Sequence, residues 1–222
     1  MDRGRSHYQI GKRILQKMRT LITGGSGLLG TEIQKHLSVY APPHREFDIT
    51  KFIPPSEIFE LVIHSAAYTD VVAAEKKRDE CYLINVQGTI NMLNAFVDTP
   101  FVYISSEYAN NPVNYYSETK KIAEIEVQKR KGPYLIIRTL FKPNPFPFPK
   151  AFTDQYTQGD YIDIIGPMII KEILSWDKKS QKLLYIGTGR KTIYNLAKRT
   201  RPDILPISIK EITTVTLPSD YE

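Results

Sequence analysis

Short apolar runs alternate with segments of helical pattern between residue 18 and about residue 140 of this 222-residue chain. The first run is MRTLIT at 18–23, and the last is YLIIRTL at 134–140. The run LVIHSAA at 61–67 is almost continuously apolar, which is typical of a strand covered on both faces. Strands that alternate with helices predict a parallel sheet with helices on both sides. We therefore expect an α/β fold built on a doubly wound parallel sheet.

The pattern changes at residue 141. The segment FKPNPFPFPK holds four prolines in ten residues, and proline removes a backbone donor and disfavours helix at the residue before it. Beyond it, the sequence predicts helices near 165–176 and 190–199 with a short strand between them. We interpret residues 141–222 as a small region packed on a core of residues 18–140.

Basic residues are concentrated at the N-terminus. Residues 1–17 carry a net charge of +4 out of a total of +6, so the rest of the chain is close to neutral. We interpret this segment as a basic, flexible extension; a transit peptide is the alternative that its composition leaves open. No basic stripe interleaved with aromatic residues is present, so we expect no nucleic-acid partner.

Two further features of the sequence bear on the cellular location of the protein. No apolar run approaches the length of a membrane span, so we expect no membrane association. The single cysteine, Cys81, cannot form an intrachain disulfide, which fits a reducing compartment. We therefore expect a cytoplasmic location.

The segment TLITGGSGLLGTEI at 20–33 joins the first strand to the first helix through a glycine-rich turn. Its glycines have G-x-x-G-x-x-G spacing, which lets backbone N–H groups approach a pyrophosphate at a helix N-terminus. We therefore predict a Rossmann-type NAD(P) site; a glycine-rich turn without a ligand is the alternative. The cofactor-side residues predicted here are Gly24, Ser26, Gly27, Leu28, Leu29 and Gly30.

The segment PPHREFDIT at 42–50 follows the second expected strand. A carboxylate at this point favours NAD, whereas an arginine accommodates the additional phosphate of NADP. Arg45 lies near the expected place, and Asp48 lies just beyond it, where it could meet the adenine. A solvated loop arginine is an equally good interpretation of Arg45, so the sequence favours NADP over NAD only slightly.

The segment NPVNYYSETKKIAE at 111–124 contains two adjacent tyrosines. In a helix, Tyr116 and Lys120 lie on one face, whereas Tyr115 has a threonine at the same spacing. The preceding strand ends in Ser105 and Ser106, and ligands of doubly wound sheets bind at the carboxyl ends of strands. We expect the lysine to lower the pKa of Tyr116, which would exchange a proton with a substrate carbonyl or alcohol. A surface pair without chemistry is the alternative.

These segments resemble the extended short-chain dehydrogenases/reductases. The matching elements are TGGSGLLG, FDIT, HSAAYTDV, NVQGT, ISSE and YYSETK, in the family's order. AAYTDVVAAE and DQYTQGDYIDIIG resemble most the branch of dTDP-4-dehydrorhamnose reductase and related nucleotide-sugar reductases. The resemblance implies a catalytic set of Ser106, Tyr116 and Lys120, with Lys120 also on the cofactor side. It further implies cofactor-side or scaffold positions at Ala66, Ala67, Tyr68 and Asn85.

The function implied by the resemblance is NAD(P)-dependent reduction of a nucleotide-linked 4-keto-6-deoxy sugar. Residues 18–140 would bind the cofactor and 141–222 would form a small substrate lobe. The family also suggests a homodimer paired through the helix that carries Tyr116. Two alternatives stay open: an epimerase or dehydratase, with Glu107 as one acid–base member and no clear second, and a non-catalytic dinucleotide-binding regulatory subunit.

The chain departs from the branch mainly in its substrate half. Ser106 and Glu107 stand where the branch usually has threonine and aspartate, and a serine hydroxyl can do the threonine's work. After Thr139 the usual tyrosine–glycine pair is replaced by the proline-rich segment. We interpret His64 as a satisfied core histidine, and no cluster of residues has metal-ligand spacing.

Overall fold

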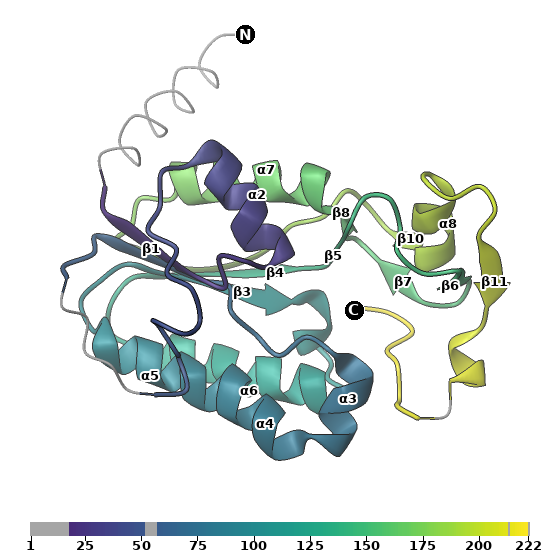
Figure 1. Cartoon of the computed structure of the whole chain (residues 1–222), viewed down its shortest axis with the longest axis horizontal. Helices are drawn as coiled ribbons and strands as arrows, with labels where there is room; N and C mark the ends of the chain where they lie inside the picture. The colour runs from purple at the N-terminus through teal and green to yellow at the C-terminus, as the bar shows by residue number, and fades with distance from the viewer. Residues whose placement is uncertain (1–17, 52–56, 213, 222) are drawn as a thin grey trace, which may run out of the picture.

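The computed structural model describes residues 18–51, 57–212 and 214–221. Their centre is a five-stranded parallel sheet with the strand order β1-β2-β3-β4-β9 (Figure 1). The strands are β1 (Thr20–Thr23), β2 (Leu61–His64), β3 (Phe101–Ser106), β4 (Tyr134–Thr139) and β9 (Gln181–Tyr185). The predicted doubly wound α/β class is therefore confirmed, whereas the predicted extension at residues 1–17 lies outside the described residues.

Helices cover both faces of the sheet (Figure 1). On one face lie α2 (Leu28–His36) and α7 (Ile162–Ser175), and on the other lie α5 (Gly88–Ala95) and α6 (Tyr115–Lys129). Successive strand side chains point to opposite faces, so Ile22 joins the apolar cluster under α2 and α7 while Leu21 joins the other. This two-sided burial is why the strands need nearly continuous apolar runs.

The chain reverses direction across the sheet after its first helix. From α2 it returns at Tyr40, which forms a parallel bridge with Leu21 on the outer side of β1. It then crosses to the opposite side of β1 to form β2. A reversal of this kind opens a crevice at the carboxyl ends of the strands, where ligands of doubly wound sheets bind. The glycine turn after β1 lies at this crevice.

The segment between β2 and β3 is helical but not uniform. It contains α3 (Val71–Lys76), α4 (Arg78–Tyr82), a π-helical segment η1 (Leu83–Gln87) and α5. Insertions of π-helix within α-helices occur frequently at functional sites, and this one places Asn85 inside the fold, where it is buried.

Residues 141–161, 186–212 and 214–221 form a small lobe at one end of the molecule (Figure 1). Its helices are α8 (Ile193–Lys198) and the 3-10 turn η3 (Ile209–Glu211). Its strands are short pairs: β5 (Phe141–Lys142) with β8 (Asp160–Tyr161), β6 (Lys150–Phe152) with β11 (Leu205–Ile207), and β7 (Tyr156–Thr157) with β10 (Lys191–Thr192). The lobe has its own apolar cluster, which includes Phe146, Tyr161 and Leu196.

The predicted boundary at residue 141 is wrong for two elements. β9 pairs with β4 as the last strand of the main sheet, and α7 packs against α2, where Gly166 faces the side chain of Glu32. Both elements therefore belong to the core, although they follow the first part of the lobe in the chain. The local pattern of α7 identifies an apolar helix, but not the surface that it covers.

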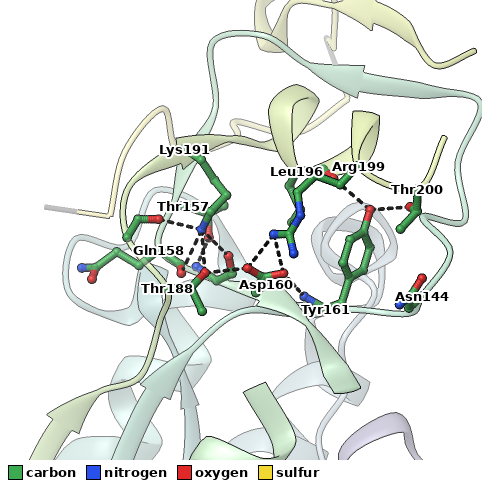
Figure 2. Close-up of polar contacts among 12 residues, drawn as sticks. Asn144, Thr157, Gln158, Asp160, Tyr161, Thr188, Lys191, Leu196, Arg199 and Thr200 are labelled. Atoms are coloured by element: carbon green, nitrogen blue, oxygen red, sulfur yellow. Dashed lines mark hydrogen bonds and ion pairs between the residues drawn. The ribbon is translucent and has the colours of Figure 1, made fainter. Parts of the chain in front are cut away.

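A polar network links separate segments of the lobe to one another (Figure 2). The Asp160 carboxylate accepts hydrogen bonds from the Arg199 guanidinium and from the Thr188 hydroxyl. The Lys191 ammonium donates to the carbonyls of Gly159 and Gly189. The charged groups of Asp160, Arg199 and Lys191 therefore have their hydrogen-bond partners within the lobe. Across the described part of the chain, no helix combines the length and the apolar character needed to cross a membrane.

Candidate active site

Glycine is required at two positions of the turn after β1. Gly24 has a φ of +71°, and a Cβ there would lie 2.7 Å from the backbone nitrogen of Ala66. A Cβ on Gly30 would collide with the carbonyl oxygen of Gly24. The turn is therefore compressed between the loop after β2 and the start of α2, which is the packing that a pyrophosphate-binding turn needs.

The N-terminus of α2 is open toward the crevice. Its N-cap is Gly27, which supplies no side-chain hydrogen bond, and Ser26, Gly27 and Leu28 are exposed. The first N–H groups of a helix have no acceptor within that helix, so they are available to an anion. Leu29 is buried in the core, so it can offer only its backbone. The site thus fits the pyrophosphate of a dinucleotide.

Asn85 links the loop after β2 to the helix α6. Its Oδ1 accepts from the Tyr68 N–H at 2.7 Å, and its Nδ2 donates to the Thr119 hydroxyl at 3.0 Å. That hydroxyl in turn donates to the Tyr116 carbonyl at 2.8 Å. Asn85 is therefore a scaffold residue that holds the loop Ala66–Tyr68 and the helix α6 in one arrangement.

His64 is a satisfied core histidine, as predicted. Its Nδ1 lies 2.7 Å from the Thr23 hydroxyl and its Nε2 lies 3.1 Å from the Thr89 hydroxyl. Burial lowers the pKa of His64 to about 3, so the ring is neutral at physiological pH. It stabilises the junction of β1 and β2 and has no free nitrogen for chemistry.

The two residues predicted at the adenosine end differ in their surroundings. The Asp48 carboxylate accepts from the N–H and the hydroxyl of Thr50, at 3.0 and 2.7 Å. This turn hydrogen bonding lowers the pKa of Asp48. Arg45 is exposed, and its ion-pair partner within the described ranges is the neighbouring Glu46, at 3.3 Å. Asp48 is committed to its own turn, whereas Arg45 remains available.

The helix α6 places Tyr116 against the end of β3. A capping box begins the helix, in which Asn114 Oδ1 accepts from the Ser117 N–H at 2.9 Å. Tyr116 is the second residue of this helix, and Ser106 is the last residue of β3. Burial raises the pKa of Tyr116 to about 12, and hydrogen bonding with the Ser106 hydroxyl opposes part of the rise. The structure thus brings the two predicted hydroxyls together.

Lys120 lies one turn further along α6 and is buried. Its Nζ donates to the Ile104 carbonyl at 2.8 Å and lies 4.3 Å from the centroid of the Tyr103 ring. Burial lowers the pKa of Lys120 to about 7, and the charge of Glu124 opposes this shift. The expected lowering of the Tyr116 pKa by Lys120 is wrong for this arrangement, because burial of the phenol dominates.

A buried ion pair beneath the lysine was not identified from the sequence. Glu124 Oε2 lies 2.7 Å from a guanidinium nitrogen of Arg138, and both side chains are buried. Ser105 donates to Glu124 at 2.5 Å, so Ser105 is committed and Ser106 is the serine that faces Tyr116. The spacing of Glu124, four residues after Lys120, was the available signal.

Glu107 and Tyr115 are occupied by structural contacts. Glu107 accepts from the Thr157 hydroxyl and from the Gln158 N–H, so each carboxylate oxygen has a donor from the lobe. The Tyr115 ring lies 4.7 Å from the guanidinium carbon of Arg78, which begins α4. In the described ranges, no group of three or more metal-ligating side chains is placed to hold a metal ion.

The doubly wound sheet, the open glycine turn and the serine, tyrosine and lysine at its carboxyl edge define a protein of the extended short-chain dehydrogenase/reductase type. A family model described as the RmlD substrate binding domain matches residues 18–166. The chain belongs to this family.

Curated relatives are similar over part of their length. A dTDP-4-dehydrorhamnose reductase of Mycolicibacterium smegmatis is 28% identical over 149 aligned residues, which cover 54% of this chain and 45% of the relative. A protein of the same name from Burkholderia thailandensis is 29% identical, with coverage of 55% and 49%. The chain thus spans about half the length of these relatives.

A solved structure agrees over more of the chain. The dTDP-4-dehydrorhamnose reductase of Bacillus anthracis, in complex with NADP, has a TM-score of 0.77 and 25% identity. The similarity covers 92% of this chain and 89% of that one. An orthologue from Clostridium acetobutylicum has a TM-score of 0.81 at 24% identity, which supports the fold.

Proposed function

We propose that this protein uses NADPH to reduce the keto group of a nucleotide-linked 4-keto-6-deoxy sugar. The observation that carries the proposal is the placement of Ser106, Tyr116 and Lys120 at the sheet edge that also carries the open glycine turn. The names of the relatives supply the substrate class, because two of them are dTDP-4-dehydrorhamnose reductases.

The glycine turn and the N–H groups that begin α2 would hold the pyrophosphate of the cofactor. Arg45, exposed in the turn that follows the Tyr40 bridge, would contact the additional phosphate of NADP, and the Bacillus anthracis neighbour was solved with that cofactor. When bound, the reduced nicotinamide supplies the hydride. The half-buried segment from Ala66 to Tyr68, held by Asn85, would form the wall on its other side.

The protein side chains would manage the proton. With a pKa of about 12, Tyr116 is protonated at physiological pH and can act as the acid. Ser106 would hydrogen-bond the same substrate oxygen and orient it. Lys120, with a pKa of about 7, would keep part of its positive charge because Glu124 lies near it, and that charge would stabilise the tyrosinate left after proton transfer.

The occupied carboxylate of Glu107 argues against the epimerase or dehydratase alternative. A dehydratase needs a further acid–base pair beside the substrate, and both oxygens of Glu107 are hydrogen-bonded to the lobe. The regulatory-subunit alternative is disfavoured by the intact serine, tyrosine and lysine. A purely dinucleotide-binding subunit has no need of a hydrogen-bonded serine and tyrosine at the sheet edge.

The test is to follow the oxidation of NADPH and of NADH by the full chain with dTDP-4-dehydrorhamnose and with other nucleotide-linked 4-keto-6-deoxy sugars. The proposal requires turnover with at least one sugar and a higher kcat/KM with NADPH. Tight dinucleotide binding without turnover of any sugar would replace it with the regulatory-subunit alternative.

We also propose that two copies pair through α6. Ile122 and Ile125 are exposed on this helix, and Tyr82 and Leu83 are exposed on the α4–η1 segment, which packs against α6. Exposed apolar side chains that cluster on adjacent elements mark interaction surfaces. Ile125→Glu should shift the protein to the monomer in sedimentation velocity, with Lys121→Glu, which introduces the same side chain elsewhere on the helix, as the control. An unmutated protein that sediments as a monomer would rule the pairing out.

A further inference from the structure

The proline-rich segment after β4 carries a basic side chain without a hydrogen bond or ion pair. Lys142 is half-buried, and no hydrogen bond or ion pair to it exists within the described residues. The other half-buried basic residues of the lobe are engaged, because Lys191 donates to carbonyls and Arg201 pairs with Asp203. Burial lowers the pKa of Lys142. A partly desolvated ammonium without an acceptor is costly unless an anion completes it.

The topology places Lys142 at the edge of the sheet where the reaction would occur. Ser106 pairs with Thr139 at the end of β4, and the chain runs on from there into β5. At ~3.3 Å per residue, Lys142 lies about 10 Å beyond Thr139. The carboxylate that most affects Lys142 is Glu107, but its oxygens are taken by Thr157 and Gln158.

An aromatic ring lies next to this lysine. The Lys142 ammonium is 5.9 Å from the centroid of the Phe148 ring. Phe148 is 53% exposed, and its ring meets the buried ring of Phe146 in an edge contact at 5.6 Å. The ring is thus anchored and yet open to stacking. An exposed aromatic ring beside an unpaired ammonium is complementary to a nucleotide. The base can stack on the ring, and the phosphate can accept a charge-assisted hydrogen bond from the ammonium.

We propose that Lys142 and Phe148 form the nucleoside diphosphate subsite, with Lys142 on the diphosphate and the Phe148 ring on the base. This inference rests on the proposed function and names the residues that hold the nucleotide end of its substrate. The diphosphate is attached to C1, across the sugar ring from the C4 carbonyl. If the C4 carbonyl lies at Ser106 and Tyr116, the diphosphate on C1 lies on the far side of the sugar ring. Lys142, which is displaced from Ser106 along the strand direction, is placed to bind that diphosphate.

The experiment is calorimetric titration of the full chain with thymidine diphosphate, uridine diphosphate, inorganic pyrophosphate and NADPH. Lys142→Met should weaken thymidine diphosphate and pyrophosphate about 10- to 100-fold, because a charge-assisted hydrogen bond is lost. Lys142→Arg should keep most of the affinity. Phe148→Ala should weaken thymidine diphosphate roughly tenfold and leave pyrophosphate unchanged. NADPH affinity should stay the same in all variants.

The matched controls are Lys150→Met and Leu205→Ala, which change an exposed lysine and an exposed apolar residue of the same lobe. If Lys142→Met fails to fold, Lys142→Gln tests the same charge in a polar side chain. Unchanged thymidine diphosphate affinity in the folded Lys142→Met or Lys142→Gln variant overturns the inference. A loss of NADPH affinity equal to the loss of thymidine diphosphate affinity also overturns it.

The two proposals can fail separately. If the unmutated protein binds thymidine diphosphate through Lys142 but reduces no sugar, the proposed reduction is wrong and the subsite stands. If it reduces a sugar and Lys142→Met has no effect on nucleotide affinity, the subsite is wrong and the reduction stands. If it binds NADPH but neither nucleoside diphosphate, both the subsite and the nucleotide-sugar class are overturned.

Discussion

At the residue scale, burial decides the protonation of the groups proposed for catalysis. It raises the pKa of Tyr116 to about 12 and lowers that of Lys120 to about 7, so each group is moved toward its neutral form. Desolvation penalises charge whatever its sign. The neighbours Ser106 and Glu124 oppose these shifts, and they are therefore the residues that tune the pair.

Tyr116→Phe should lower kcat by ~10²–10⁴-fold, the usual contribution of a general acid. Folding and dinucleotide binding should survive, because one hydroxyl is removed and little volume changes. Tyr115→Phe is the matched control, since its ring lies against Arg78 at the start of α4. Near-normal turnover of the Tyr116 variant would show that another group supplies the proton.

At the element scale, two glycines at the start of α2 have different roles, because one is needed for packing and the other for ligand binding. Gly30 is fixed by packing, because any Cβ there collides with Gly24. Gly27 is exposed and extended, with φ −76° and ψ 172° at the N-cap, and a Cβ there would lie 3.3 Å from the Gly24 carbonyl oxygen, which is a tight contact and not a collision. We therefore expect that the glycine at position 27 serves the close approach of a ligand to the start of α2 more than it serves the fold.

Gly27→Asp should abolish measurable NADPH binding while the protein remains folded or becomes slightly more stable. Aspartate is a favoured N-cap, so it would satisfy an N–H of the first turn and stabilise the helix by about 0.5–2 kcal/mol. The same carboxylate would repel a pyrophosphate. Gly27→Ser is the uncharged control, with a smaller loss of affinity by calorimetry. Unchanged affinity in a folded Asp variant would show that the pyrophosphate does not bind at this turn.

At the scale of the whole molecule, one carboxylate joins the core to the lobe directly beside the proposed site. Glu107 follows Ser106 in the chain and accepts hydrogen bonds from Thr157 and Gln158 of the lobe. Burial raises the pKa of Glu107, so the folded state binds this proton more tightly than the unfolded state. Its contribution to stability therefore decreases as the pH rises from its unfolded pKa through its folded pKa.

Glu107→Gln should reduce the free energy of unfolding by about 1–3 kcal/mol at neutral pH. The glutamine has one oxygen and one NH2 group, so it can accept from only one of the two donors, the Thr157 hydroxyl and the Gln158 N–H, and its NH2 group faces the other. Hydrogen exchange should accelerate at 157–159 while the strands of the main sheet stay protected. The variant should also lack the acid-side pH dependence of stability described above. Glu118→Gln, at an exposed position of α6, is the control. Unchanged exchange at 157–159 would show that other contacts hold the lobe.

The sequence by itself determined the sheet class, the glycine turn and the pairing of Tyr116 with Lys120. These follow from local rules: the burial pattern of strands, the steric freedom of glycine and the spacing of a helix face. Only the tertiary structure decided that α7 and β9 belong to the core, that Ser105 is hydrogen-bonded to Glu124, and that both carboxylate oxygens of Glu107 are hydrogen-bonded to the lobe. Each of these depends on a partner far away in the chain, and no local pattern encodes which distant surface a side chain will meet.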